Sequence, residues 1–212
     1  MIDLFIGTFM ALFSVVNPLG AMPVFVTLTQ ESSPGYRKAM AIRATIFMAC
    51  ILILFFLFGT YIIQFFGISL ESMRIAGGLI IIKAGYSLLN SNYEKEKGLG
   101  KKVRKDAMKR TDISFSPLAM PMLSGPGSIA LMIGIGGTLT DISGYFIVIS
   151  ATVAVALISF VILIVSPKLV EKLGQSGIVA LSKMMGFIVL CIGIQYIVNG
   201  AAPLLGKIFI QN

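Results

Sequence analysis

The chain contains no histidine, no tryptophan and only two cysteines. Without histidine it lacks the side chain most often used as a general base and as a metal ligand. Cys50 and Cys191 lie far apart in apolar stretches and form no C-x-x-C pair, so we expect two free, buried thiols. The sequence also contains no His- or Cys-based metal motif, so an enzyme is the least favoured class of protein.

Charge is scarce as well. Only 12% of the residues are charged and 57% are hydrophobic, whereas soluble domains carry about 25% charged residues. A helix of about 20 apolar residues crosses a bilayer. Six apolar blocks of roughly this length follow one another, at 4–29, 39–65, 72–90, 115–137, 143–166 and 179–205. The first block has no basic leader, which argues against a signal peptide. The sequence therefore predicts an all-α membrane protein with six transmembrane helices.

The basic residues are unevenly distributed over the connections between these blocks. Eight of the 17 lysines and arginines lie in the polar stretch 91–114, and six more flank the connections between blocks one and two and between blocks five and six. The opposite side has only Arg74 and Lys207. Under the positive-inside rule, the basic connections are cytoplasmic and both termini face outward. The net charge of +8 thus indicates topology and contact with lipid headgroups, and it does not indicate nucleic acid binding.

The polar stretch 91–114 divides the chain into two parts with three spans each. An odd number of spans per part inserts the second part upside down relative to the first. Asn17-Pro18 aligns with Gly125-Pro126 at an offset of 108 residues, and Arg74–Gly77 aligns with Lys183–Gly186 at an offset of 109. We therefore predict two inverted three-helix repeats, 1–90 and 115–212, joined by a cytoplasmic basic linker at 91–114.

Spans one and four are interrupted by proline and glycine. The first break reads N-P-L-G-A-M-P (Asn17–Pro23) and the second P-L-A-M-P-M-L-S-G-P-G-S (Pro117–Ser128), and together they contain five of the eight prolines. Unpaired backbone is not tolerated in lipid, so each break must be buried in protein or line a cavity. Broken helices at corresponding positions are typical of transporter substrate sites. The alternative is a pair of proline kinks without a site.

The residues at the breaks indicate how a solute would bind. Asn17 is suited to cap a restarting helix, and Pro126 is suited to the first helical position. The start of a helix offers free N–H groups and a positive dipole end, which favour a carboxylate. No acidic residue is expected at mid-membrane depth, so a carboxylate proton relay and a cationic substrate are both disfavoured. We predict that a zwitterion or neutral solute binds at Asn17, Pro18, Gly20, Ser124, Gly125, Pro126, Gly127 and Ser128.

Other residues inside the spans have more than one interpretation. Lys83 is a candidate for coupling or gating, and snorkelling toward the interface is an equally good interpretation. Gln195 in the sixth span is a second candidate, as site lining or as an interhelical contact. Glycines 77, 78 and 85 are expected to allow close helix packing. Arg74 and Lys183 are expected to anchor spans at the headgroups.

Three segments resemble the signatures of the MarC family of six-span inner-membrane proteins: Ser14–Phe25, Arg74–Gly78 and Pro117–Ile129. The match extends over essentially the whole chain. Family motif positions fall on Asn17, Pro18, Gly20 and Pro23, and on Pro117, Pro121, Gly125, Pro126 and Gly127. Some members transport small neutral amino acids such as glycine and alanine, and the resemblance implies that activity here.

The resulting expectation is a secondary transporter in the inner (plasma) membrane, with a small neutral amino acid and the lipid bilayer as its partners and no cofactor. Na⁺ and H⁺ are the candidate coupling ions. The alternatives are an exporter of another small metabolite or drug, and a channel-like or structural membrane protein. The direction of transport and the oligomeric state stay open.

Overall fold

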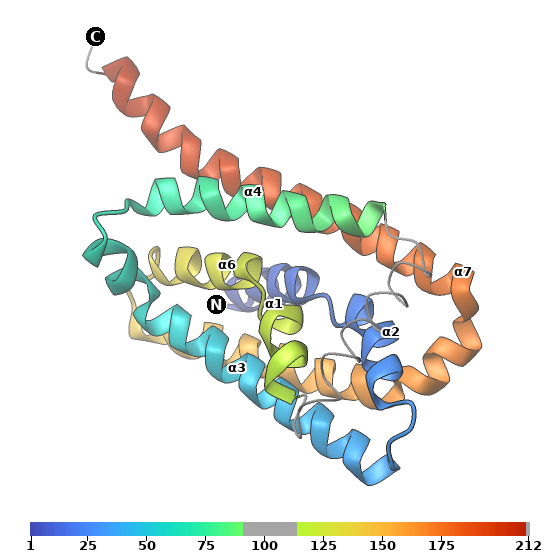
Figure 1. Cartoon of the computed structure of the whole chain (residues 1–212). Helices are drawn as coiled ribbons and strands as arrows, with labels where there is room; N and C mark the ends of the chain where they lie inside the picture. Colours follow the sequence, from blue (N-terminus) through green and yellow to red (C-terminus); the bar gives the residue numbers. More distant parts are fainter. Residues whose placement is uncertain (91–113, 211–212) are drawn as a thin grey trace.

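The computed structural model describes residues 1–90 and 114–210, and no strand occurs among them. The elements are α1 (Ile2–Val16), α2 (Pro18–Thr29), α3 (Pro34–Phe65), α4 (Leu70–Leu89), the π-helical segment η1 (Ser114–Leu123), α6 (Pro126–Gly136) and α7 (Ile142–Ile210) (Figure 1). The expected linker at 91–114 lies outside the described residues, apart from Ser114.

Five helical stretches are long and apolar enough to cross a membrane: Ile2–Thr29, Pro34–Phe65, Leu70–Leu89, Ile142–Gly174 and Ser176–Gly206. Each coincides with one of the apolar blocks of the sequence. The remaining block is occupied by η1 and by the shorter apolar helix α6. The prediction of an all-helical membrane protein is therefore confirmed.

Helix α7 contains two of these spans, joined at Gly174. This glycine has φ 63° and ψ −174°, a conformation outside the helical region that glycine adopts without steric cost. The chain turns back on itself in this region, and the two helical arms diverge from the bend (Figure 1). Lys168 and Lys172, which were expected to flank a connection, lie on the last helical turns before this bend.

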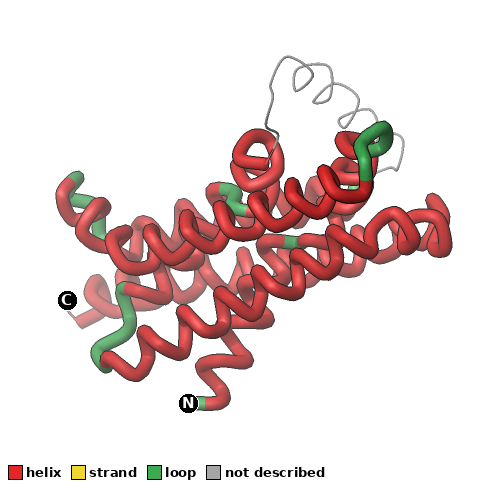
Figure 2. Tube along the Cα trace, turned by 90° about the horizontal axis from the view of Figure 1, so that it is seen from below, coloured by secondary structure: helices red, strands yellow, loops and turns green. Residues whose placement is uncertain are grey.

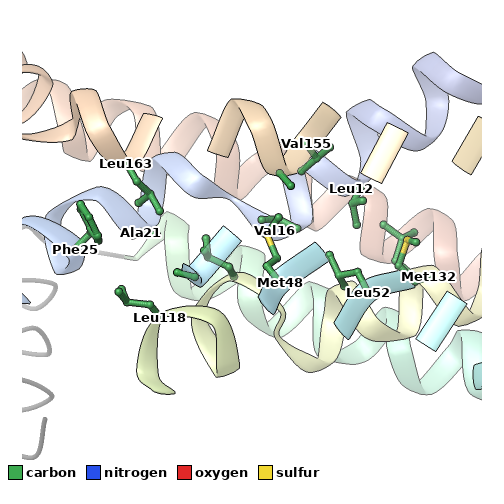
Figure 3. Packing of buried hydrophobic residues seen from close by; sticks show 14 of the residues in the cluster. Leu12, Val16, Ala21, Phe25, Met48, Leu52, Leu118, Met132, Val155 and Leu163 are labelled. Carbon is green, nitrogen blue, oxygen red and sulfur yellow. The ribbon is translucent and has the colours of Figure 1, made fainter. Parts of the chain in front are cut away.

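Each broken span packs against a long helix from the other part of the chain. The α1–α2 pair lies on α7, while η1 and α6 lie on α3. The side chains between them form a hydrophobic core that is mostly aliphatic and contains Leu12, Val16, Met48, Leu52 and Phe25 (Figure 3). Short non-helical stretches occur inside this bundle as well as at its ends (Figure 2). Asn17 and Pro18 at the first break and Ser124 at the second are buried, whereas Pro126 is exposed.

Helices α4 and α7 approach each other most closely, at paired glycines. A Cβ added to Gly78 would lie 2.7 Å from the Gly193 carbonyl oxygen, and one added to Gly85 would lie 2.8 Å from that of Gly186. The expected role of Gly78 and Gly85 in helix packing agrees with this geometry, because small residues let two membrane helices bring their backbones together. Gly77 faces α6 instead, where its added Cβ would meet the Ala130 side chain at 2.6 Å.

The expectation of buried thiols is wrong. Cys50 and Cys191 are free, but both lie exposed on the outer surface of the helices. In a membrane the outer surface contacts lipid tails, which are as apolar as the protein interior. An apolar neighbourhood in the sequence therefore does not show which face of a span points inward.

The glycine contacts generate a stability prediction. In Gly85→Ala the new methyl group would lie 2.7 Å from the Leu190 backbone nitrogen, so α4 and α7 must separate. We expect a loss of about 2 kcal/mol of unfolding free energy, the usual cost of overpacking, measured by denaturant unfolding in detergent. The matched control is Gly7→Ala on α1, where an added Cβ meets nothing within 4 Å. Equal stability of the two variants would contradict close α4–α7 contact.

Candidate functional site

Asn17 forms the first break and closes one helix while it starts the next. Its backbone is left-handed, with φ 48° and ψ 62°, and its N–H donates to the Phe13 carbonyl at 2.9 Å. Its side-chain Oδ1 accepts a hydrogen bond from the Gly20 N–H at 3.2 Å, and its carbonyl accepts from the Ala21 N–H at 3.3 Å. The predicted interruption of the helix, with Asn17 at the cap of the second piece, is confirmed.

This turn depends on the residue types that form it. Asn17 is the only non-glycine residue with positive φ among the described residues, and asparagine tolerates that region better than most side chains do. Pro18 occupies the first helical position of α2, where its missing N–H removes no hydrogen bond within α2. At Gly20 an added Cβ would collide with the Asn17 amide, so glycine allows the cap to close.

The second break separates η1 from α6. Its two serines are buried, and each donates to the local backbone: Ser124 Oγ to the Ala119 carbonyl at 2.7 Å, and Ser128 Oγ to the Gly125 carbonyl at 2.9 Å. Pro126 is the first helical residue of α6, and Gly125 is its cap in an extended conformation. The expected start of a helix at Pro126 is confirmed.

The two breaks lie next to each other in the bundle. A Cβ added to Gly127 would be 3.1 Å from Ile81 Cγ1 on α4 and 3.5 Å from Val15 Cγ1 at the end of α1. Helices α2 and α6 therefore both begin in the interior. The first N–H groups of a helix have no acceptor within the helix and carry a partial positive charge. This arrangement can attract an anionic group without a charged side chain.

A cavity of about 280 Å³ opens beside the first break. Its polar side chains are those of Asn17 and Ser87, and the rest of the lining is glycine and aliphatic side chains. The lining residues are Val15, Val16, Asn17, Gly20, Ala21, Ala84, Ser87, Leu88 and Met122. Small-molecule sites share this mainly apolar character with a few placed polar groups. The cavity is a candidate site for a small solute.

The structure brings only some of the predicted site residues to this cavity. Asn17 and Gly20 line it, and Pro18 is buried beside them. At the second break, Ser124, Gly127 and Ser128 are buried, Gly125 is half-buried and Pro126 is exposed, and none of these five is among the lining residues. The region of the second break contributes only Met122, which precedes it.

Helix α4 provides lining residues that the sequence reasoning did not identify. Ala84, Ser87 and Leu88 lie on its last two turns and face the cavity. The only available signal was the hydroxyl of Ser87, which the apolar block 72–90 shares with Ser72 and Tyr86. Lys83 lies on the same helix but is exposed, on a face shared with the exposed side chains of Leu79 and Tyr86.

Gln195 is also exposed, and its Nε2 donates to the Asn199 Oδ1 at 2.8 Å. Neither Gln195 nor Lys83 lines the cavity. Their roles in coupling or gating stay predictions.

Arg74 holds a position that the sequence did not predict. Its guanidinium donates to the Gly134 carbonyl at 3.2 Å, in the last turn of α6. A cation at the carboxyl end of a helix is favoured by the helix dipole. The same helix accepts a hydrogen bond from the buried Tyr196, whose hydroxyl lies 2.9 Å from the Ala130 carbonyl oxygen. Arg74 therefore binds α6 within the protein, in addition to any contact with headgroups.

An all-helical chain with several apolar spans, two of them interrupted inside the bundle, is a multi-pass integral membrane protein. The family described as MarC family integral membrane protein matches residues 2–205, so the chain belongs to the MarC family.

Similar proteins include a membrane protein of Methanocaldococcus jannaschii, 36% identical over 92% of this chain and 95% of its own length. The membrane protein YhcE of Escherichia coli is 33% identical over 91% of this chain and 89% of its own length. The inner membrane protein MarC of Citrobacter koseri is 31% identical over 97% and 98%. No solved structure matches the chain significantly.

The capping role of Asn17 leads to a second prediction. Asn17→Ala removes the acceptor of the Gly20 N–H and places a β-carbon without a capping oxygen in the left-handed region. We expect a loss of about 1–2 kcal/mol in unfolding free energy. Asn17→Gly, which adopts the left-handed backbone without strain and adds no buried charge, should lose much less. Denaturant unfolding in detergent measures both, and an equally stable Asn17→Ala variant would show that the cap contributes nothing.

Proposed function

We propose that this chain is a secondary transporter of small neutral amino acids, of the glycine and alanine class, that works by alternating access across the inner membrane. The observation that carries the proposal is the pair of adjacent helix breaks inside the bundle, with a cavity at the Asn17 cap. Discontinuous helices whose N-termini point at the carboxylate of a substrate are a recurring feature of such transporters.

The chemistry of the cavity fits a zwitterion with a small side chain. The positive end of the α2 dipole at Asn17 favours a carboxylate, and the Asn17 amide group lines the cavity. The Gly20 and Ala21 N–H groups are already bound by Asn17, and the start of α6 at Gly125 does not line the cavity. On the other side of the break, Pro18 has no N–H to give to the Ser14 carbonyl, and the left-handed turn at Asn17 ends the α1 ladder. The last carbonyls of α1 are thus suited to receive an ammonium group or a Na⁺ ion. Na⁺ and H⁺ are both retained as candidate coupling ions.

The size of the cavity also agrees with this substrate class. Its volume of about 280 Å³ lies just below the range of about 300–1,000 Å³ for pockets that hold drug-sized ligands, which suits a smaller solute. No acidic residue lines it, so a lysine-like or arginine-like side chain would find no counter-ion there. Apolar walls formed by Val15, Ala21 and Leu88 suit a hydrogen atom or a methyl group.

The proposed inverted repeat is supported by the glycine contacts between α4 and α7. The glycine contacts favour an offset of 108 residues over the 109 that aligned Gly77 with Gly186 in the sequence. The offset of 108 relates Gly78 to Gly186 and Gly85 to Gly193, and it also relates Asn17 to Gly125. Under this offset, the residues equivalent to the contacting pair Gly78 and Gly193 are Gly186 and Gly85, which are also in close contact. Such an exchange is expected of two halves related by a pseudo-two-fold axis. The reciprocal packing of the broken spans on α7 and α3 agrees with it.

The transport proposal is tested by uptake into proteoliposomes. We expect saturable uptake of labelled glycine and alanine, above that of empty liposomes, under an imposed Na⁺ or H⁺ gradient. Asn17→Ala and Gly125→Leu should each reduce uptake at least about tenfold, because positioning at a site is sensitive to small displacements. Gly7→Ala, far from any packed neighbour, should transport normally. No uptake of any small amino acid under either gradient would refute the proposal.

A separate prediction concerns orientation in the membrane. In a variant with Cys50→Ala and Cys191→Ala, a single cysteine is placed at the exposed start of α3, as Gly35→Cys, or in the exposed connection between α3 and α4, as Ile68→Cys. The positive-inside rule places the connection at Ile68 outside and the start of α3 at Gly35 in the cytoplasm. A membrane-impermeant maleimide added to intact cells should therefore label the cysteine at 68 and leave the one at 35 unlabelled until the cells are opened. The reverse pattern would contradict the proposed orientation.

A further inference from the structure

The cavity and the most tightly closed part of the bundle lie at opposite ends of α4. Ala84, Ser87 and Leu88, which line the cavity, belong to the carboxyl-terminal turns of this helix. Arg74, in its second turn, lies at the other end, where α6 is held by hydrogen bonds. We propose that Tyr196 is the gate that closes the substrate path at the end where α4 begins, the proposed outer side. This inference rests on the proposed function.

The Tyr196 side chain fills the space between α4, α6 and α7. It is 8% exposed, and its hydroxyl lies 2.9 Å from the Ala130 carbonyl oxygen and 3.2 Å from that of Leu131. A Cβ on Gly134 would overlap the Tyr196 hydroxyl, and a Cβ on Gly77 would lie 3.5 Å from the Tyr196 ring. The two glycines therefore form a slot that the ring occupies.

Arg74 secures the ring in this slot. Its guanidinium donates to the Gly134 carbonyl and lies beside the Tyr196 hydroxyl. A buried tyrosine hydroxyl needs a hydrogen-bond partner. When Tyr196 leaves the α6 carbonyls, it must exchange them for water or for another protein group. Movement of the ring is thus linked to the entry of water at this end of the bundle.

The proposed repeat indicates why this residue, among the many buried ones, would act as a gate. The offset of 108 residues places Leu88 at the position equivalent to Tyr196. Leu88 lines the open cavity, whereas Tyr196 fills the equivalent space at the other end. In the proposed pseudo-symmetric bundle, the end at Leu88 is open and the end at Tyr196 is filled by the tyrosine side chain. Alternating access requires the two ends to exchange these states, so Tyr196 must withdraw for the path to open on its side.

The test measures accessibility and needs no substrate. In the Cys50→Ala, Cys191→Ala variant, a single cysteine at Ala130 reports on the space beneath Tyr196, and one at Ser87 reports on the cavity. Maleimide reagents that do not cross membranes are applied from each side of reconstituted vesicles. With Tyr196 present, the cysteine at 130 should react slowly and the one at 87 quickly, from opposite sides.

Tyr196→Ala should accelerate labelling at 130 and slow labelling at 87. We expect labelling at 130 to accelerate about tenfold or more, since a minor conformation populated at about 0.1–10% can rise by at least that factor. Tyr196→Phe, which retains the ring and is expected to fold, should move both rates in the same directions by a smaller factor. Unchanged labelling at 130 in both variants would overturn the proposal. Faster labelling at both positions would also overturn it, because it would show that Tyr196 only fills space.

These outcomes separate the gate from the proposed substrate. Suppose that labelling in Tyr196→Ala rises at 130 and falls at 87 but the protein takes up no amino acid. The proposed gate then stands, and the proposed substrate class is wrong. Suppose instead that the protein transports glycine but the cysteine at 130 stays unreactive in Tyr196→Ala. The proposed substrate class then stands, and the proposed gate is wrong.

Discussion

Every peptide N–H and C=O inside a bilayer needs a partner within the protein, and the structure around both breaks follows from this constraint. At the first break the Asn17 side chain and backbone take up three of these groups, from Gly20, Ala21 and Phe13. At the second break, Ser124 and Ser128 bind the carbonyls of Ala119 and Gly125. Because uncharged side chains satisfy these turns, both helices can begin in the interior without a buried charge that would itself need a partner.

The same constraint separates the bundle into parts of different character. Where α4 meets α7, backbones touch at Gly78, Gly85, Gly186 and Gly193, and little sliding is possible without a steric clash. The broken spans pack on α3 and α7 through aliphatic side chains such as Leu12, Met48 and Val155 (Figure 3). An aliphatic side chain can change rotamer during a small rotation, whereas backbone atoms in contact have no such freedom. Movement between halves is therefore easier around the broken spans than between α4 and α7.

Much of the fold could be predicted from the sequence, because the length of an apolar segment and the positions of proline and glycine determine local structure directly. The spans, the restart of helices at Asn17 and Pro126, and the packing role of Gly78 and Gly85 all follow from residue type alone. The exposure of Cys50 and Cys191, the lining role of Ser87 and the contact of Arg74 with Gly134 depend on which face of a span turns inward. In a lipid environment both faces are apolar, so the sequence carries little information about that choice.

A cavity built in this way restricts the kind of selectivity that a transporter can have. The helix dipole at Asn17 and the carbonyls at the end of α1 would recognise what all amino acids share, their carboxylate and ammonium. Discrimination among side chains is then left to the volume between Val15, Ala21, Ala84 and Leu88. An apolar wall distinguishes one methylene by only about 1–3 kcal/mol. The proposed site therefore suits several small solutes and excludes larger side chains because they do not fit. It does not select a single substrate through hydrogen bonds to the side chain.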